Sequence, residues 1–194
     1  MNIYLIRHGQ TRLNKAKQMQ GRLDEPLSVN GKRQAEQMHE QLADIPFDAV
    51  YASPLRRAHL TASIVSGWKQ DDIILDERLL EVSFGKYEGK NYYTMGLGMT
   101  LYWAVPEIFP VPDTVETLDE MRARSRSFLQ DLEKQDYENV LIAAHGGILR
   151  TMNGYLLDRK NGLLWRPKMG NCEVRVYSSV DGSHRFLRDY KLKE

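Results

Sequence analysis

The chain has 194 residues, of which 42% are hydrophobic and 27% are charged, values ordinary for a globular protein with a sizeable core. Its formal net charge of +1 gives no overall attraction to nucleic acid or to an anionic membrane, so any positive potential has to be local. The single cysteine, Cys172, excludes an intrachain disulfide and a CxxC site. No signal-peptide pattern and no membrane-length apolar run occur, so we expect a cytoplasmic protein without a membrane partner.

The first predicted element is a buried strand that ends in a histidine. Residues 3–6 are apolar, and Arg7, His8 and Gly9 follow at the carboxyl end, where glycine permits a turn. In open α/β sheets ligands bind at this edge. A guanidinium beside an imidazole can bind phosphoryl oxygens and attack phosphorus. The alternative is a structural histidine held by hydrogen bonds.

A polar loop and an amphipathic helix come next. Residues 11–22 are polar and basic, which is typical of a loop with a helical turn. Ser28 is a suitable N-cap for a helix. The apolar positions of this helix follow helical spacing and are Ala35, Met38, Leu42 and Ile45.

A second strand leads into a helix that begins with two arginines. Residues 48–52 predict the strand, and Ser53 and Pro54 predict the N-cap and first position of the helix. Arg56 and Arg57 then fall in its first turn. Cationic side chains there oppose the helix dipole, which favours a functional role for at least one of them.

An acidic residue lies inside the next apolar segment. Residues 73–75 predict a brief strand, and residues 79–85 are mostly apolar but contain Glu81. A carboxyl group among apolar neighbours favours its protonated form and can serve as a general acid. The alternative is a glutamate at a strand edge that faces water.

Residues 89–112 differ from the rest of the chain because they are rich in aromatic residues and carry only two charges, Lys90 and Glu107. We interpret them as a partly helical insert over the edge of the sheet. The insert either adds to the core or forms a lid or an apolar pocket wall. An exposed aromatic surface would also allow a homo-oligomer.

A second buried strand ends in the same way as the first. Residues 117–120 have the form of a capping box and open an amphipathic helix. Residues 139–144 predict a buried strand that stops at His145, followed by two glycines. If both strands belong to one parallel sheet, His8 and His145 meet at the same edge, which favours a catalytic role for them.

The order of these elements predicts the fold class. The tail, residues 173–190, alternates as a hairpin around Asp181 and Gly182. No linker or internal repeat interrupts the alternation of strands and helices. We therefore expect one α/β domain over residues 1–194, built as a three-layer α/β/α sandwich around a mostly parallel central sheet.

Five ordered blocks of residues resemble the histidine phosphatase (phosphoglycerate mutase-like) superfamily, and the chain is most similar to its broad-specificity and α-ribazole phosphatases. The blocks are Arg7-His8-Gly9 with Asn14, the Gly21 to Gly31 pattern, Ser53-Pro54-Leu55-Arg56-Arg57-Ala58 with Thr61-Ala62, Leu80-Glu81 to Gly89, and Ala144-His145-Gly146-Gly147.

The resemblance implies a site and its chemistry. His8 would be the nucleophile that is transiently phosphorylated, and Glu81 would donate a proton to the leaving oxygen. Arg7, Arg57 and His145 would be the other catalytic residues and would bind the phosphoryl group, together with Asn14, Gln20 and Gly21. These cations supply the charge that phosphoryl transfer needs, so we expect no metal and no cofactor.

The implied function is hydrolysis of a small-molecule phosphomonoester. The alternatives are a cofactor-dependent phosphoglycerate mutase and a module that binds phosphoanions without turnover. The short, charge-poor insert favours the phosphatase and a hydrophobic or ring-bearing leaving group. Arg22 is a candidate second anion contact. His39, His59 and His184 fall outside the family blocks and are expected at the surface or in packing.

Overall fold

The computed structural model describes residues 1–158 and 168–192, whose strands form one six-stranded sheet in the order β3-β2-β4-β1-β5-β6. The strands are β1 (Asn2–Arg7), β2 (Ala49–Ala52), β3 (Ile74–Leu75), β4 (Asn139–Ala144), β5 (Val174–Val180) and β6 (Ser183–Tyr190). The first four neighbours pair in parallel, whereas β5 pairs antiparallel with both β1 and β6. The predicted mostly parallel sheet and the hairpin at its end are confirmed.

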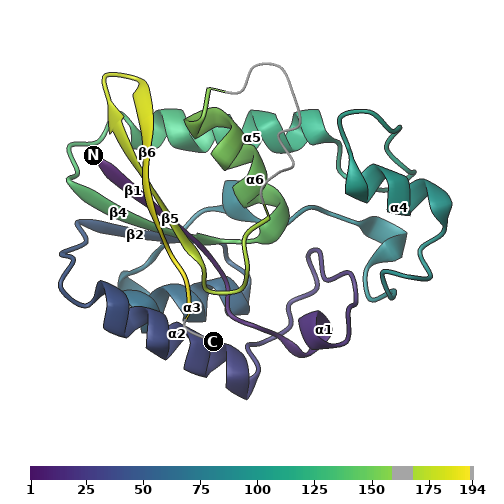
Figure 1. The fold of residues 1–194 in the computed structure, drawn as a ribbon, viewed down its shortest axis with the longest axis horizontal. Helices are drawn as coiled ribbons and strands as arrows, with labels where there is room; N and C mark the ends of the chain where they lie inside the picture. The colour runs from purple at the N-terminus through teal and green to yellow at the C-terminus, as the bar shows by residue number, and fades with distance from the viewer. Residues whose placement is uncertain (159–167, 193–194) are drawn as a thin grey trace.

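Helices cover both faces of this sheet, which gives three layers (Figure 1). The helices α2 (Val29–Leu42) and α3 (Arg56–Ser66) pack on one face, and α5 (Leu118–Leu132) and α6 (Gly146–Leu156) pack on the other. Short elements join them: α1 (Arg12–Lys15), α4 (Leu97–Ala104), and the 3-10 helices η1 (Gln70–Asp72), η2 (Glu77–Leu79) and η3 (Gly85–Tyr87). The three-layer α/β/α sandwich predicted from the sequence is confirmed.

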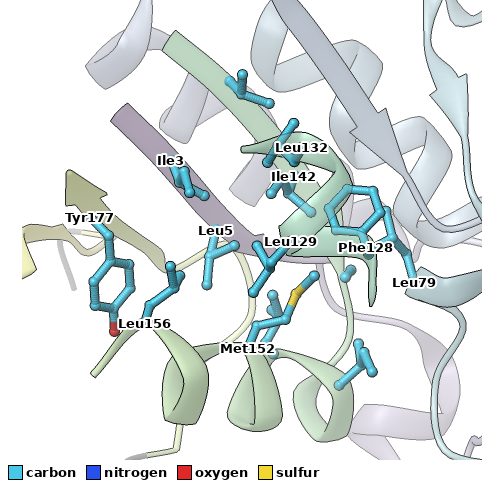
Figure 2. Packing of buried hydrophobic residues seen from close by; sticks show 14 of the residues in the cluster. Ile3, Leu5, Leu79, Phe128, Leu129, Leu132, Ile142, Met152, Leu156 and Tyr177 are labelled. Carbon is cyan, nitrogen blue, oxygen red and sulfur yellow. The ribbon is translucent and has the colours of Figure 1, made fainter. Parts of the chain in front are cut away.

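The alternation of side chains along β1 builds two cores. Ile3 and Leu5 pack with α5 and α6 in the cluster that Figure 2 shows, whereas Tyr4 and Ile6 pack with α2 and α3 on the opposite face. Successive residues of a strand point to opposite faces, so a central strand covered on both sides is apolar throughout.

The pairing of β1 with β4 brings the two histidine segments together. Arg7 stands beside Ala144 in the register, and the amide of His8 donates to the Ala144 carbonyl at 3.0 Å. The two strands therefore end at the same level. His8 and His145 follow at the same edge of the sheet, as predicted.

Two local predictions were wrong in their details. The helix α3 begins at Arg56 with Leu55 as its N-cap residue, not at Ser53 and Pro54, because the Ser53 hydroxyl binds His145 instead. The helix α2 ends at Leu42, so Ile45 packs from the following loop. The segment around Glu81 is irregular, so the alternative of a glutamate at a strand edge does not apply.

The aromatic insert forms a third cluster beyond the end of the sheet. In Figure 1, α4 and its flanking loops lie on the far side of the molecule from the start of β1. Met95, Met99 and Tyr102 of the insert are buried against residues from other parts of the chain, among them Phe84 and Met121. The insert therefore extends the core, which was one of the two interpretations. No helix in the described part of the chain has the length and apolar content needed to span a membrane.

Candidate active site

His8 is a buried imidazole whose hydrogen bond identifies its tautomer. Its side chain is 2% exposed, and Nδ1 lies 2.7 Å from the carbonyl oxygen of Gly9. Because a carbonyl only accepts, Nδ1 carries the proton and Nε2 keeps its lone pair. Burial, followed by the charges of Arg57 and Arg7, lowers the pKa of His8 well below its ordinary value of 6.5.

His145 has the opposite tautomer. Arg57 Nε donates to Nδ1 of His145 at 3.2 Å, so the proton of His145 lies on Nε2, which contacts the Ser53 hydroxyl at 2.8 Å. Burial and the neighbouring Arg57 lower the pKa of His145 well below 6.5. The rings of His8 and His145 are 5.1 Å apart between centroids. Two neutral imidazoles therefore lie next to each other, surrounded by arginines.

The guanidinium of Arg57 is fully buried and joins three parts of the chain. Besides His145, it donates to the carbonyl of Gly21 at 2.7 Å and to that of Leu23 at 2.6 Å. Burial lowers its pKa to about 10, so the group remains a cation at neutral pH. This arrangement fixes the loop that contains Gly21 against the two histidines.

Arg7 keeps one donor free at the same edge. Its Nη1 donates to the carbonyl of Met169 at 2.8 Å, whereas its buried Nε has no hydrogen-bond partner in the described part of the chain. A buried cation with an unpaired N–H is costly unless a ligand completes it. Burial lowers the pKa of Arg7, and the nearby carboxylate of Glu81 opposes that effect.

Glu81 is held by the first turn of α6. Its Oε1 accepts from the amides of Val82 at 3.0 Å, Gly147 at 3.0 Å and Ile148 at 3.3 Å, while Oε2 shares only the Gly147 amide, at 3.1 Å. His145 is the N-cap residue of α6 but makes no side-chain cap. The Glu81 carboxylate replaces that cap, which explains why it is buried and does not face water.

Two side-chain amides present their nitrogen atoms to the same region. Asn14 Oδ1 accepts from the Thr11 amide at 3.1 Å, and Gln20 Oε1 accepts from the Thr11 hydroxyl at 2.5 Å. Because both oxygens are engaged, the NH₂ groups of Asn14 and Gln20 are the groups that can donate to a ligand.

Most of these residues line one cavity of about 220 Å³. The predicted site residues on its surface are Arg7, His8, Asn14, Gln20, Gly21 and Glu81. Arg57 and His145 are fully buried and are not among the lining residues, although they contact the residues that are. The fold thus brings all eight predicted residues together, with six at the cavity and two behind them.

The cavity has further lining residues that the predicted site did not include. Tyr92 and Trp103 of the insert form walls of the cavity, so the insert supplies a pocket wall as well as core, and both interpretations of it hold in part. Arg150 and Lys168 also line the cavity.

Two supporting hydroxyls were missed as well. Ser53 binds His145, and the Thr61 hydroxyl accepts from the Gly9 amide at 3.1 Å and donates to the Arg57 carbonyl at 2.6 Å. No local signal marks either contact, because each joins distant parts of the chain.

Arg22 does not lie where a second anion contact was expected. Its guanidinium contacts Glu116 at 3.5 Å and the carbonyl of Glu81 at 3.4 Å, and it does not line the cavity. The remaining histidines are structural, as expected. His39 and His59 bind backbone carbonyls, and His184 pairs with Glu133.

The chain belongs to the histidine phosphatase superfamily (branch 1), whose family model matches residues 3–190. It is 38% identical over 176 residues to "Putative phosphoserine phosphatase 2" of Hydrogenobacter thermophilus, covering 89% of this chain and 86% of the relative. It is 30% identical over 180 residues to "Probable phosphoglycerate mutase GpmB" of an Enterobacter species, covering 90% and 83%. The family predicted from the sequence is confirmed.

Solved structures give the same result. The α-ribazole phosphatase from Shigella flexneri superposes with a TM-score of 0.85 at 26% identity, covering 96% of this chain and 95% of that structure's chain. The family and these phosphatase relatives identify the chain as a phosphoric monoester hydrolase.

Proposed function

We propose that the chain hydrolyses a small phosphomonoester through a phosphohistidine at His8. The observation that carries this proposal is His8 beside the guanidinium-bearing side chain of Arg7, both of which line the cavity. Nε2 of His8 attacks phosphorus as the ester P–O bond breaks, and Glu81 gives its proton to the leaving oxygen. Glu81 then takes a proton from water as the water oxygen attacks phosphorus and the P–N bond breaks, which releases inorganic phosphate.

The phosphoryl oxygens are assigned to donors around His8. We assign them to the guanidinium of Arg7 and the side-chain NH₂ groups of Asn14 and Gln20, because these three residues line the cavity. Arg57 adds positive charge from behind, and it keeps His145 next to His8. Stabilisation by fixed donors is the main protein contribution to phosphoryl transfer.

The hydrogen bonds of Glu81 indicate which oxygen moves the proton. Oε1 accepts from three backbone amides, so its lone pairs are engaged. Oε2 shares only one of these donors, which leaves it able to carry the acidic proton. We assign proton donation to Oε2 and orientation of the group to Oε1.

A phosphoglycerate mutase is the second candidate, because one relative carries that name. In a mutase the phosphoryl group returns to an organic acceptor, whereas in a phosphatase it passes to water. The two are separated by supplying 3-phosphoglycerate with and without 2,3-bisphosphoglycerate and following phosphate release and isomerisation together. Isomerisation that outpaces phosphate release would establish the mutase.

Three further features belong to the proposal. Residues 1–194 act as a single histidine phosphatase domain in which residues 89–112 form the insert. The protein works in the cytoplasm, which agrees with the lone cysteine of the sequence.

The exposed apolar side chains of the insert, Tyr93, Leu97 and Ile108, allow a homo-oligomer, which sedimentation analysis would test.

The experiment that tests the function is phosphate release from p-nitrophenyl phosphate by the purified protein, with no metal added. His8→Ala should lower kcat by at least about 1,000-fold, because the nucleophile is lost. His39→Ala is the matched control, since His39 binds a backbone carbonyl on α3 and lies outside the cavity. Equal activity in His8→Ala and the unmodified protein would disprove the proposal.

A further inference from the structure

The main chain that carries Glu81 lies outside the helices and strands. Residues 80–84 connect η2 to η3 without regular secondary structure. Backbone amides at the start of α6 bind the carboxylate of Glu81, but they do not bind its main chain. A shift of about 1 Å is enough to disrupt proton transfer. The path of this segment therefore has to be fixed by side chains from elsewhere in the fold.

Arg124 of α5 binds the main chain just before Glu81. Its Nη1 donates to the carbonyl of Arg78 at 2.7 Å and to the carbonyl of Leu80, the residue that directly precedes Glu81, at 2.6 Å. The side chain of Arg124 is 15% exposed, so these charge-assisted hydrogen bonds are largely shielded from water.

Glu116 binds the main chain just after Glu81. Its own amide donates to the carbonyl of Ser83 at 2.8 Å, and its Oε2 accepts from the amide of Ser83 at 3.1 Å. Arg124 connects the two sides, because its Nε and Nη2 donate to the two carboxylate oxygens of Glu116 at 2.6 and 3.1 Å. Two parallel hydrogen bonds of this kind fix the relative orientation of a guanidinium and a carboxylate.

This ion pair lies behind the cavity wall. Neither Arg124 nor Glu116 is among the residues that line the cavity, so neither is in place to contact a substrate there. Glu81 does line the cavity, and the pair binds its neighbours on both sides in the chain. Any effect of the pair on the reaction therefore passes through Glu81.

We propose that the ion pair of Arg124 and Glu116 positions Glu81 for proton transfer to the leaving oxygen. Both are positioning residues: α5 fixes the main chain around Glu81 through them, while α6 fixes the carboxylate. The inference rests on the proposed phosphatase function, in which Glu81 is the proton donor, and adds the means by which that donor is held. Loss of the pair should weaken acid assistance and leave His8 as the nucleophile.

Phenyl phosphate and p-nitrophenyl phosphate together measure acid assistance. Phenolate is the poorer leaving group and needs a proton from an acid, whereas p-nitrophenolate leaves without one. The ratio of kcat/KM for phenyl phosphate to kcat/KM for p-nitrophenyl phosphate therefore falls when the acid is displaced. Both esters are measured on one preparation, so a loss of folded protein cancels from the ratio.

Arg124→Gln should lower this ratio about 10-fold, which is part of the ~100- to 10,000-fold that a general acid contributes. Arg124→Lys keeps a cation beside Glu116 but lacks the planar fork, so it should lower the ratio by a smaller factor. Glu81→Gln removes the acid itself and should lower the ratio at least as far as Arg124→Gln. Arg126→Gln, at an exposed position of the same helix, should leave the ratio unchanged.

The outcomes separate the inference from the function on which it rests. If Glu81→Gln lowers the ratio but Arg124→Gln keeps it, the pair is only structural, the inference is wrong and the phosphatase stands. If Arg124→Gln does not fold because Glu116 is left unpaired, an unchanged ratio in Arg124→Lys overturns the inference by itself. If neither ester is hydrolysed, or Glu81→Gln keeps the ratio, the proposed function or its proton donor is wrong and the inference fails with it.

Discussion

The backbone amide of Gly147 donates to both carboxylate oxygens of Glu81, at 3.0 Å from Oε1 and 3.1 Å from Oε2. No side chain fits at this glycine, since a Cβ atom would lie 2.6 Å from Oε1 of Glu81. The first turn of α6 thus holds the carboxylate of Glu81, the proposed proton donor, in position. The same helix begins directly after His145, so one element positions both groups.

We predict that Gly147→Ala displaces Glu81 and lowers kcat by about 10- to 100-fold with a smaller change in KM, because a shift of about 1 Å is enough to disrupt proton transfer. Gly98→Ala is the control, since a Cβ atom there meets nothing within 4 Å in α4. Steady-state kinetics with thermal melting of both variants check the prediction. A Gly147→Ala protein with the kcat of the unmodified enzyme would contradict it.

The neutral histidines predict how stability depends on pH. Burial and nearby arginines lower the pKa values of His8 and His145 well below 6.5. Above pH 6.5 the native and unfolded states are both neutral at these positions. Below it the unfolded chain binds protons that the native state excludes, so the free energy of unfolding should fall as pH falls.

His8→Asn removes one of the two histidines that bind a proton in the unfolded chain but not in the native state. Between about pH 5 and pH 7, the slope of the unfolding free energy should therefore decrease by up to ~1.4 kcal/mol per pH unit. Urea unfolding of the two proteins over that range measures the slope. Identical slopes would mean that His8 titrates alike in the native and unfolded states.

Ser53→Ala should lower kcat, because the Ser53 hydroxyl is the partner of His145 Nε2 and fixes its tautomer. The unpaired buried N–H should also cost about 1–3 kcal/mol of unfolding free energy. Ser66→Ala loses a serine hydrogen bond of similar length, 2.7 Å to the Ala62 carbonyl, at the far end of α3. Kinetics and urea unfolding should show lower stability in both variants and a lower kcat only in Ser53→Ala.

The parts of the fold that depend on local sequence patterns could be predicted. The apolar runs before His8 and His145 each define a buried strand, and the glycine after each histidine marks its end. The capping box at Thr117 gives the start of α5. Because parallel strands share an edge, these patterns were enough to bring the two histidines together.

The rest of the site depends on contacts between distant segments, which no local pattern records. Serine is a favourable N-cap residue, but the Ser53 hydroxyl binds His145 and the helix α3 starts later, at Arg56. Glu81 gains its place only when α6 provides amides to hold it. Arg150 lies on Trp103 only after the insert folds over the cavity, so the charge-poor insert alone suggested a hydrophobic pocket.

The central claim is that His8 carries the phosphoryl group, and trapping that intermediate tests it most directly. Glu81→Gln should still accept the group from p-nitrophenyl phosphate, whose leaving group needs no acid, but should lose the base that activates water. Rapid quenching at alkaline pH and peptide mass analysis should then find acid-labile phosphate on His8. Turnover by the unmodified enzyme with no phosphate on His8 in either protein, or with phosphate on another residue, would contradict the account.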